Sequence, residues 1–160
     1  MDFGAFAFDL GAESTFRDVE AVPYIGLEIV YYAGADDDTY GYVTFNDNFV
    51  KTLVVGVFMN TFYASSSADA PEYWTVMLQG GMKSIADDKF GLDFIFAYYQ
   101  STEDIDDKGI GWEFNAVGSY RYTEDVTFGL GIGYFSPDED MAGEDPDAAM
   151  VAFLSVVILF

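Results

Sequence analysis

The stretch VTFGLGIGYF, residues 126–135, alternates between large and small side chains. Its even-numbered positions carry Val126, Phe128, Leu130, Ile132 and Tyr134, whereas three of its five odd-numbered positions are glycine. Because successive side chains of a β-strand point to opposite faces, this pattern predicts a strand with one large apolar face and one nearly empty face. The large face must be covered by a protein core or by lipid, and this choice constrains the fold of the whole chain.

The same period of two recurs along most of the chain, and no segment has a convincing helical stripe of apolar residues. The patterns predict strands over residues 19–33, 40–46, 49–64, 72–85, 89–101, 109–123, 126–136 and 148–160. Residues 4–11 are a ninth candidate. The count stays even if residues 1–18 form a non-spanning segment, or if 40–64 is one strand and 4–11 is the first. The chain could also be part of a larger barrel.

Charge is segregated along the sequence. The chain has 28 acidic and 6 basic residues and a formal net charge of −22, yet 51% of its residues are hydrophobic. The acids gather around residues 36–38, 103–107 and 138–147, which predicts solvated loops between apolar strands. Such an acidic surface repels nucleic acid, so no nucleic-acid partner is expected. The length of 160 residues fits a single domain over 1–160.

The less apolar strand faces carry glycine, Thr, Ser, Asn, Gln and few charges, which is too little polarity for a wall facing water. Tight turns at 86–88 and 123–125 alternate with longer polar connections, as in outer-membrane barrels. We therefore expect an all-β, antiparallel, up-and-down transmembrane β-barrel with eight strands in the bacterial outer membrane, its apolar side chains facing lipid. Aromatic residues near the strand ends would form interfacial girdles: Trp74, Tyr98, Trp112, Tyr122 and Tyr134.

Five ionisable residues fall on the faces assigned to the lumen: Glu28, Lys83, Asp93, Glu113 and Arg121. They could form an ion path or a gate, or a network of salt bridges that fills the interior. Buried charges need partners, and an eight-stranded barrel is just wide enough to be filled by side chains. The structural network, with Lys83 and Arg121 neutralising their neighbours, is the favoured interpretation.

The chain contains neither histidine nor cysteine. The usual general base, thiolate chemistry and disulfides are therefore absent, so we expect no enzymatic activity, cofactor or metal centre. The longest apolar run, 148–160, is too short for a transmembrane helix, which needs about 20 residues. The first ten residues lack the basic and apolar regions of a secretory signal peptide, so an exported protein would be represented here in processed form.

An acidic loop could bind a hard divalent cation or a cationic partner through carboxylate oxygens. Its candidate ligands are Asp138, Glu139, Asp140, Glu144, Asp145 and Asp147. Their spacing matches no known calcium loop, which favours a solvated loop instead.

The region from residue 90 to the end resembles the C-terminal strands of the alginate-export family of outer-membrane porins. The resembling motifs are Gly111-Trp112-Glu113, Ser119 to Tyr122, Val126-Thr127-Phe128 and Gly133 to Pro137. The resemblance implies a barrel that conducts an anionic polymer through a lumen lined with basic residues. The six basic residues of this chain are too few for that lumen, so the fold carries over and alginate transport does not. Phe160 matches the C-terminal aromatic residue that many outer-membrane proteins present to their insertion machinery.

These observations predict a small outer-membrane barrel with a structural, surface-display or narrow-channel role. Its partners would be outer-membrane lipid and the insertion machinery. The alternatives are a porin-like, cation-preferring channel or half of a larger porin, and a soluble ligand-binding β-barrel.

Overall fold

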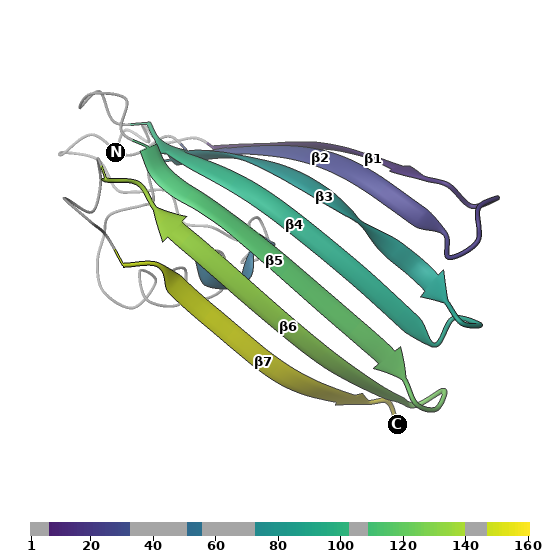
Figure 1. The fold of residues 1–160 in the computed structure, drawn as a ribbon. Coiled ribbons are helices and arrows are strands. Elements are labelled where there is room, and N and C mark those ends of the chain that lie inside the picture. Colours follow the sequence, from purple (N-terminus) through teal and green to yellow (C-terminus); the bar gives the residue numbers. More distant parts are fainter. Residues whose placement is uncertain (1–6, 33–50, 56–72, 103–108, 140–146) are drawn as a thin grey trace, which may run out of the picture.

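The computed structural model describes residues 7–32, 51–55, 73–102, 109–139 and 147–160. These residues form one antiparallel sheet of seven strands whose order in space follows their order in the chain (Figure 1). The strands are β1 (Ala7–Thr15), β2 (Pro23–Tyr32), β3 (Tyr73–Ile85), β4 (Phe90–Ser101), β5 (Gly109–Arg121), β6 (Val126–Pro137) and β7 (Ala149–Ile158). The expected all-β, antiparallel, up-and-down architecture is confirmed.

Period-two alternation located the strands well. Strands β2 to β5 and β7 lie within five of the predicted ranges, β6 extends one residue beyond the range 126–136, and the ninth candidate at 4–11 overlaps β1, which pairs with β2. The strand predicted over 49–64 is wrong at residues 51–55, where Leu53–Val55 are helical. The strand predicted over 40–46 lies outside the described residues.

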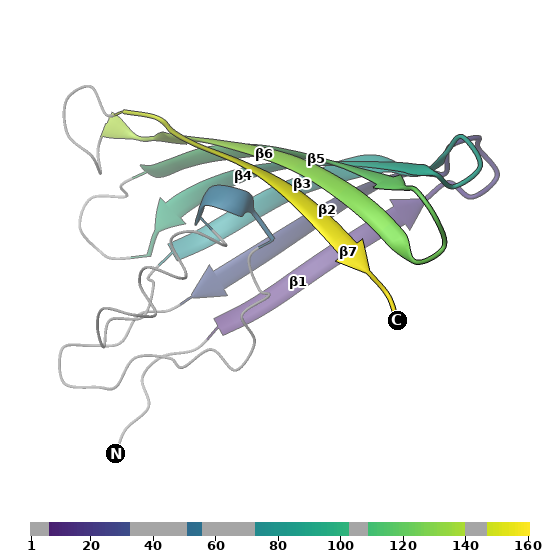
Figure 2. The same cartoon turned by 90° about the horizontal axis from the view of Figure 1, so that it is seen from below.

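The sheet is open within the described part of the chain, because β1 pairs only with β2 and β7 only with β6. Its strands curve together into an arch (Figure 2). The connections at 86–89 and 122–125 are tight turns at one end of the sheet, where the seven-residue connection 16–22 also lies, whereas the connections from β2 to β3, β4 to β5 and β6 to β7 leave from the other end (Figure 1). This end-to-end difference agrees with the predicted wiring. No helix within the described ranges is both long and apolar enough to cross a membrane.

The two faces of the arch differ in burial. Residues on the concave face are buried at its centre, where the row across the strands runs Glu28, Met77, Ala97, Glu113 and Phe135. The neighbouring row on the convex face runs Leu27, Leu78, Phe96, Phe114 and Tyr134, and these side chains are 37–50% exposed. The large apolar side chains therefore point away from the inside of the curve, which is the direction that the sequence analysis expects for them.

Gly129, Gly131 and Gly133 of β6 lie on the concave face, where neighbouring side chains occupy the space that a larger residue would need. A Cβ on Gly131 would overlap the ring of Phe153, which reaches across from β7. A Cβ on Gly133 would come within 3.0 Å of Leu53, in the segment that lies against the concave face (Figure 2). The small face of residues 126–135 thus looks inward and makes room for other parts of the chain.

Candidate functional site

Residues 51–55, here called the anchored segment, lie against the concave face of the sheet (Figure 2). Thr52, Val54 and Val55 in this segment are buried. Val54 and Val55 belong to a cluster with apolar side chains of the sheet, among them Val30, Met77 and Phe135. Burial of apolar surface is favourable but not directional, so polar contacts must set the orientation of the segment.

Glu113 of β5 makes the most specific of these contacts. Its side chain is fully buried, and its two carboxylate oxygens accept hydrogen bonds from the backbone N–H groups of Val54 and Val55, at 2.6 and 2.9 Å. The first N–H groups of a helical turn have no partner within the turn, and a carboxylate near them satisfies both their hydrogen bonding and their dipole. Glu113 therefore caps the helical turn Leu53–Val55 from the wall of the sheet.

Asn115 of β5 and Tyr99 of β4 make further hydrogen bonds to the anchored segment beside Glu113. The Oδ1 of Asn115 accepts a hydrogen bond from the backbone N–H of Leu53 at 3.1 Å. The hydroxyl groups of Tyr99 and Thr52 are hydrogen-bonded at 2.6 Å, and the Tyr99 hydroxyl also donates to Glu113 at 3.4 Å. Three consecutive backbone N–H groups of the segment are thus paired with side chains of β5.

Glu28 of β2 holds the start of the segment. Its Oε2 accepts hydrogen bonds from Lys51 Nζ and Gln79 Nε2, both at 2.6 Å. The Glu28 side chain is 6% exposed, whereas that of Lys51 is 51% exposed. A buried carboxylate without a cation is costly. Lys51 therefore neutralises Glu28 and also holds the segment to β2, whereas Glu113 holds it to β5.

The anchored segment is therefore held by charged or polar side chains from β2, β4 and β5, with apolar packing between them. A segment fixed in this way fills space on the inner side of the curved sheet. The arrangement makes the anchored segment a structural plug on that side of the sheet.

The structure divides the five residues predicted as one lumen charge network among different parts of the concave face. All five lie on strand positions of the concave face, as their alternation predicts. However, the two ion pairs of the described residues are Lys51–Glu28 and Lys83–Glu13, so none of the five pairs with another. Lys83 pairs instead with Glu13 of β1, which is outside the predicted set, and Arg121 is in neither of these ion pairs.

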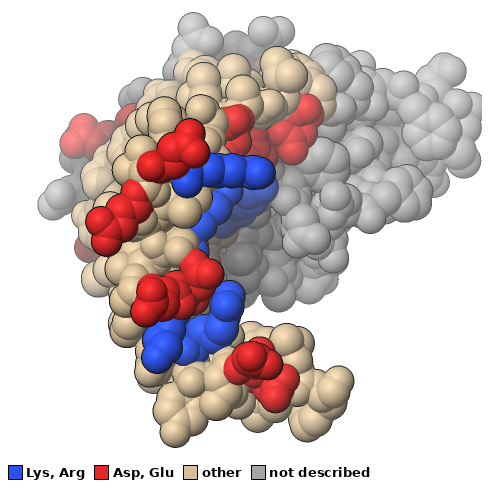
Figure 3. All heavy atoms as spheres, turned by 90° about the vertical axis from the view of Figure 1, so that its right-hand side faces the viewer, with Lys and Arg blue, Asp and Glu red and all other residues tan. Residues whose placement is uncertain are grey.

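Lys83 and Asp93 belong to a second cluster nearer the turn end. Lys83 Nζ lies 2.6 Å from Glu13 and 4.4 Å from the centre of the Tyr24 ring, and the Tyr24 hydroxyl donates to Asp93 at 2.6 Å. Arg121 is exposed at the end of β5. At this end of the molecule Lys and Arg side chains gather on the inner side of the arch, with Asp and Glu beside them (Figure 3).

Sequence reasoning missed the residues that complete the site. Tyr99 and Asn115 occupy the same strand phase as Glu113, so the alternation could have identified them as inward-facing. Lys51 could not be found in this way, because its segment was interpreted as a strand. Its pairing with Glu28 depends on how the chain folds back over the sheet.

The predicted cation-binding loop is only partly described. Asp138, Glu139 and Asp147 lie in described residues, whereas Asp140, Glu144 and Asp145 lie outside them. The Asp138 backbone N–H donates to Ile110 at 2.9 Å, which continues the pairing of β5 with β6. Among the described residues, no three acidic, histidine or cysteine side chains come together as metal ligands.

Comparison of the chain with protein-family models, with curated proteins and with solved structures finds no match.

The two ion pairs allow a matched stability test of the anchored segment. We expect Lys51→Met to destabilise the protein by about 1–3 kcal/mol, because it leaves the buried Glu28 carboxylate without its cation. Lys83→Met should cost at most about 1 kcal/mol, since both members of that pair are roughly half exposed. Urea titration of the folded protein, followed by tryptophan fluorescence, measures both values. Equal effects would contradict the anchoring role of Lys51.

Proposed function

We propose that this protein is a non-enzymatic outer-membrane β-barrel whose interior is occupied by the anchored segment, and whose role is structural or one of surface display. The observation that carries the proposal is the chemistry of the convex face. Within the described strands every side chain on that face is uncharged, and a broad surface of exposed large apolar residues covers it. Soluble monomers rarely expose continuous apolar patches beyond a few hundred Å², whereas lipid requires such a surface.

Aromatic residues on the convex face support the proposal because they form two bands. Near the end with the long connections, Trp74 packs with Tyr98 and Trp112 packs with Tyr134. Near the turn end, Phe90 stacks on Tyr120. Barrels in membranes have aromatic girdles at both interfaces. Four of the five aromatic residues predicted for girdles lie in the first band, and Tyr122 contacts Tyr120 in the second.

The spacing of the bands fits a membrane. Phe90 and Tyr98 are eight residues apart on β4, which corresponds to about 27 Å along an extended strand. With the tilt usual for barrels this is about 20 Å across the membrane, near the apolar thickness of about 25 Å. The strands of 9–13 residues also match the roughly 9–11 residues that a spanning strand needs.

A barrel in lipid must have no free edge, because unpaired backbone groups cannot be satisfied there. With seven antiparallel strands, β1 and β7 run in the same direction. Antiparallel closure therefore requires an odd number of additional strands, and the complete barrel would have an even number, as in bacterial single-chain barrels.

A porin-like, cation-preferring channel is the second candidate. It is favoured by the excess of acids on the concave face, where Asp9, Glu13, Glu28, Asp93 and Glu113 outnumber the bases Lys51, Lys83 and Arg121. Carboxylates lining a pore favour cations. The anchored segment argues for the closed form, because it occupies the inner side of the sheet.

A heat-modifiability gel tests the proposed function. We expect the protein refolded in detergent or vesicles to migrate differently before and after boiling, because a closed barrel resists unfolding by the gel detergent at room temperature. Refolding without detergent should give aggregates, since the convex face then meets water. A monodisperse monomer in detergent-free buffer would contradict the proposal and would favour a soluble ligand-binding barrel.

A further inference from the structure

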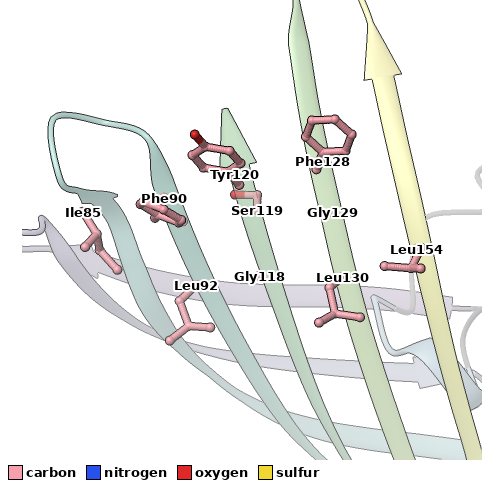
Figure 4. Close-up of a pocket in the computed structure, with 11 residues that line it drawn as sticks. Ile85, Phe90, Leu92, Gly118, Ser119, Tyr120, Phe128, Gly129, Leu130 and Leu154 are labelled. Carbon is pink, nitrogen blue, oxygen red and sulfur yellow. The ribbon is translucent and has the colours of Figure 1, made fainter. Parts of the chain in front are cut away.

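A groove lies on the convex face towards the turn end of the sheet (Figure 4). Its volume is about 470 Å³, which falls within the usual range of ligand sites of about 300–1,000 Å³. Leu92, Leu130 and Leu154 form its sides, and Gly118 of β5 lies between them (Figure 4). The groove is separate from the anchored segment, which lies on the opposite face.

Gly118 forms the floor of the groove because it has no side chain. A Cβ on Gly118 would approach no other group within 4 Å except the carbonyl oxygen of Leu130, at 4.0 Å. The position differs from Gly131, where the missing side chain makes room for Phe153. No neighbouring group of the described chain fills the space above Gly118, so a ligand is free to enter it.

The chemistry of the lining selects an apolar ligand. None of the lining residues is charged, and apolar side chains provide nearly all of the surface. A polar metabolite or a peptide backbone would lose hydrogen bonds to water without replacement. The Tyr120 hydroxyl group is at the end of the groove nearest the turns, beside Phe90 and Phe128 (Figure 4). Tyrosine and other aromatic residues prefer the level of lipid headgroups.

We propose that this groove binds one acyl chain of a membrane phospholipid. The chain lies over Gly118 between Leu92 and Leu130, and the headgroup lies beyond Tyr120 at the turn end. This inference rests on the proposed function, because lipid meets the convex face only if the protein spans a membrane. It adds a specific lipid site to a surface that otherwise contacts lipid without selection.

Fluorescence quenching can detect the bound chain. The chain has two tryptophans, Trp74 and Trp112, which are replaced by phenylalanine, and Phe128→Trp places one reporter at the groove. The protein is held in micelles of a bile-salt detergent, which has no acyl chain. A phospholipid with a brominated acyl chain is then added in small molar steps, and bromine quenches the reporter on contact.

Gly118→Leu is the test variant, because its Cβ meets no close neighbour and the rest of its side chain occupies the floor of the groove. Gly80→Leu is the matched control: Gly80 lies on the convex face outside the groove, and its Cβ would approach only the Tyr24 carbonyl oxygen, at 3.4 Å. We expect the Gly118→Leu protein to need about tenfold or more phospholipid for half-maximal quenching, and the Gly80→Leu protein to behave as the parent. Equal titrations of all three proteins would overturn the proposal.

Two further measurements identify the molecule that occupies the groove. A brominated free fatty acid that quenches at the same concentration as the phospholipid would overturn the assignment to a phospholipid. The second outcome concerns a second copy of the chain. If the parent protein dimerises without quenching and the Gly118→Leu protein stays monomeric, the groove is assigned to a second copy, and the phospholipid proposal is overturned. The heat-modifiability gel is run on the parent and on every variant. Absence of a folded band in the parent signals failure of the proposed function, whereas its loss in one variant only signals that this variant misfolds; Gly118→Ala then replaces Gly118→Leu in the titration.

Discussion

Phe96→Arg is expected to destabilise the membrane-inserted protein by about 1–3 kcal/mol, because an arginine on the lipid-facing side of a barrel costs about 2–4 kcal/mol at the midplane and about 0–1 kcal/mol near the interfaces, and Phe96 lies between these two depths. Phe96 lies on the convex face of β4 between the two aromatic bands and is 45% exposed. Lipid cannot solvate the guanidinium group at that depth. The shift of the urea unfolding midpoint in lipid vesicles, read from the ratio of folded to unfolded bands on the gel, measures the effect.

Val117→Arg is the control, because it introduces the same charge on the opposite face of the sheet. Val117 is half-buried on β5 and pairs across the strands with Asp93, so the new cation has an acid beside it. Its cost should be clearly smaller than that of Phe96→Arg. If the convex face met water, Phe96→Arg would stay within about 0.5 kcal/mol of the parent, as most surface substitutions do. That result would contradict the membrane proposal.

Glu113→Ala is expected to release the anchored segment from the sheet. The substitution removes the acceptor of two buried N–H groups, and each buried donor left without a partner costs about 1–3 kcal/mol. The segment can avoid this cost by leaving the concave face. We therefore expect faster trypsin cleavage after Lys51 in the folded protein, together with a higher conductance in planar bilayers.

Glu13→Ala is the matched control for Glu113→Ala. It also removes a carboxylate from the concave face, but Glu13 is about half exposed, pairs with Lys83, and forms no hydrogen bond or ion pair with the segment within the described residues. Cleavage after Lys51 should not change in this variant. Glu113→Gln should behave between the two, because its amide retains one acceptor oxygen. Unchanged cleavage and conductance in Glu113→Ala would show that Glu113 does not hold the segment.

The sequence by itself determined the two faces of each strand. In β6, the alternation of Phe128, Leu130 and Ile132 with glycines places the large side chains on one face whatever the surroundings, because alternation is a property of the extended backbone. The same rule placed Glu28, Asp93 and Glu113 together on the concave face. The scarcity of charged side chains on the other faces led to the prediction that the large apolar faces point outward, and the convex face carries them.

Only the tertiary structure decided which of the inward residues meet. Glu113 and the backbone of Val54 are 59 residues apart in the chain, and Glu28 and Lys51 are 23 apart. Such contacts depend on the register of several strands and on the path of the segment across the sheet, neither of which is a local property. The same limit explains the wrong strand at 51–55: Val54 and Val55 favour a strand locally, but a buried carboxylate that accepts two adjacent N–H groups stabilises a helical turn instead.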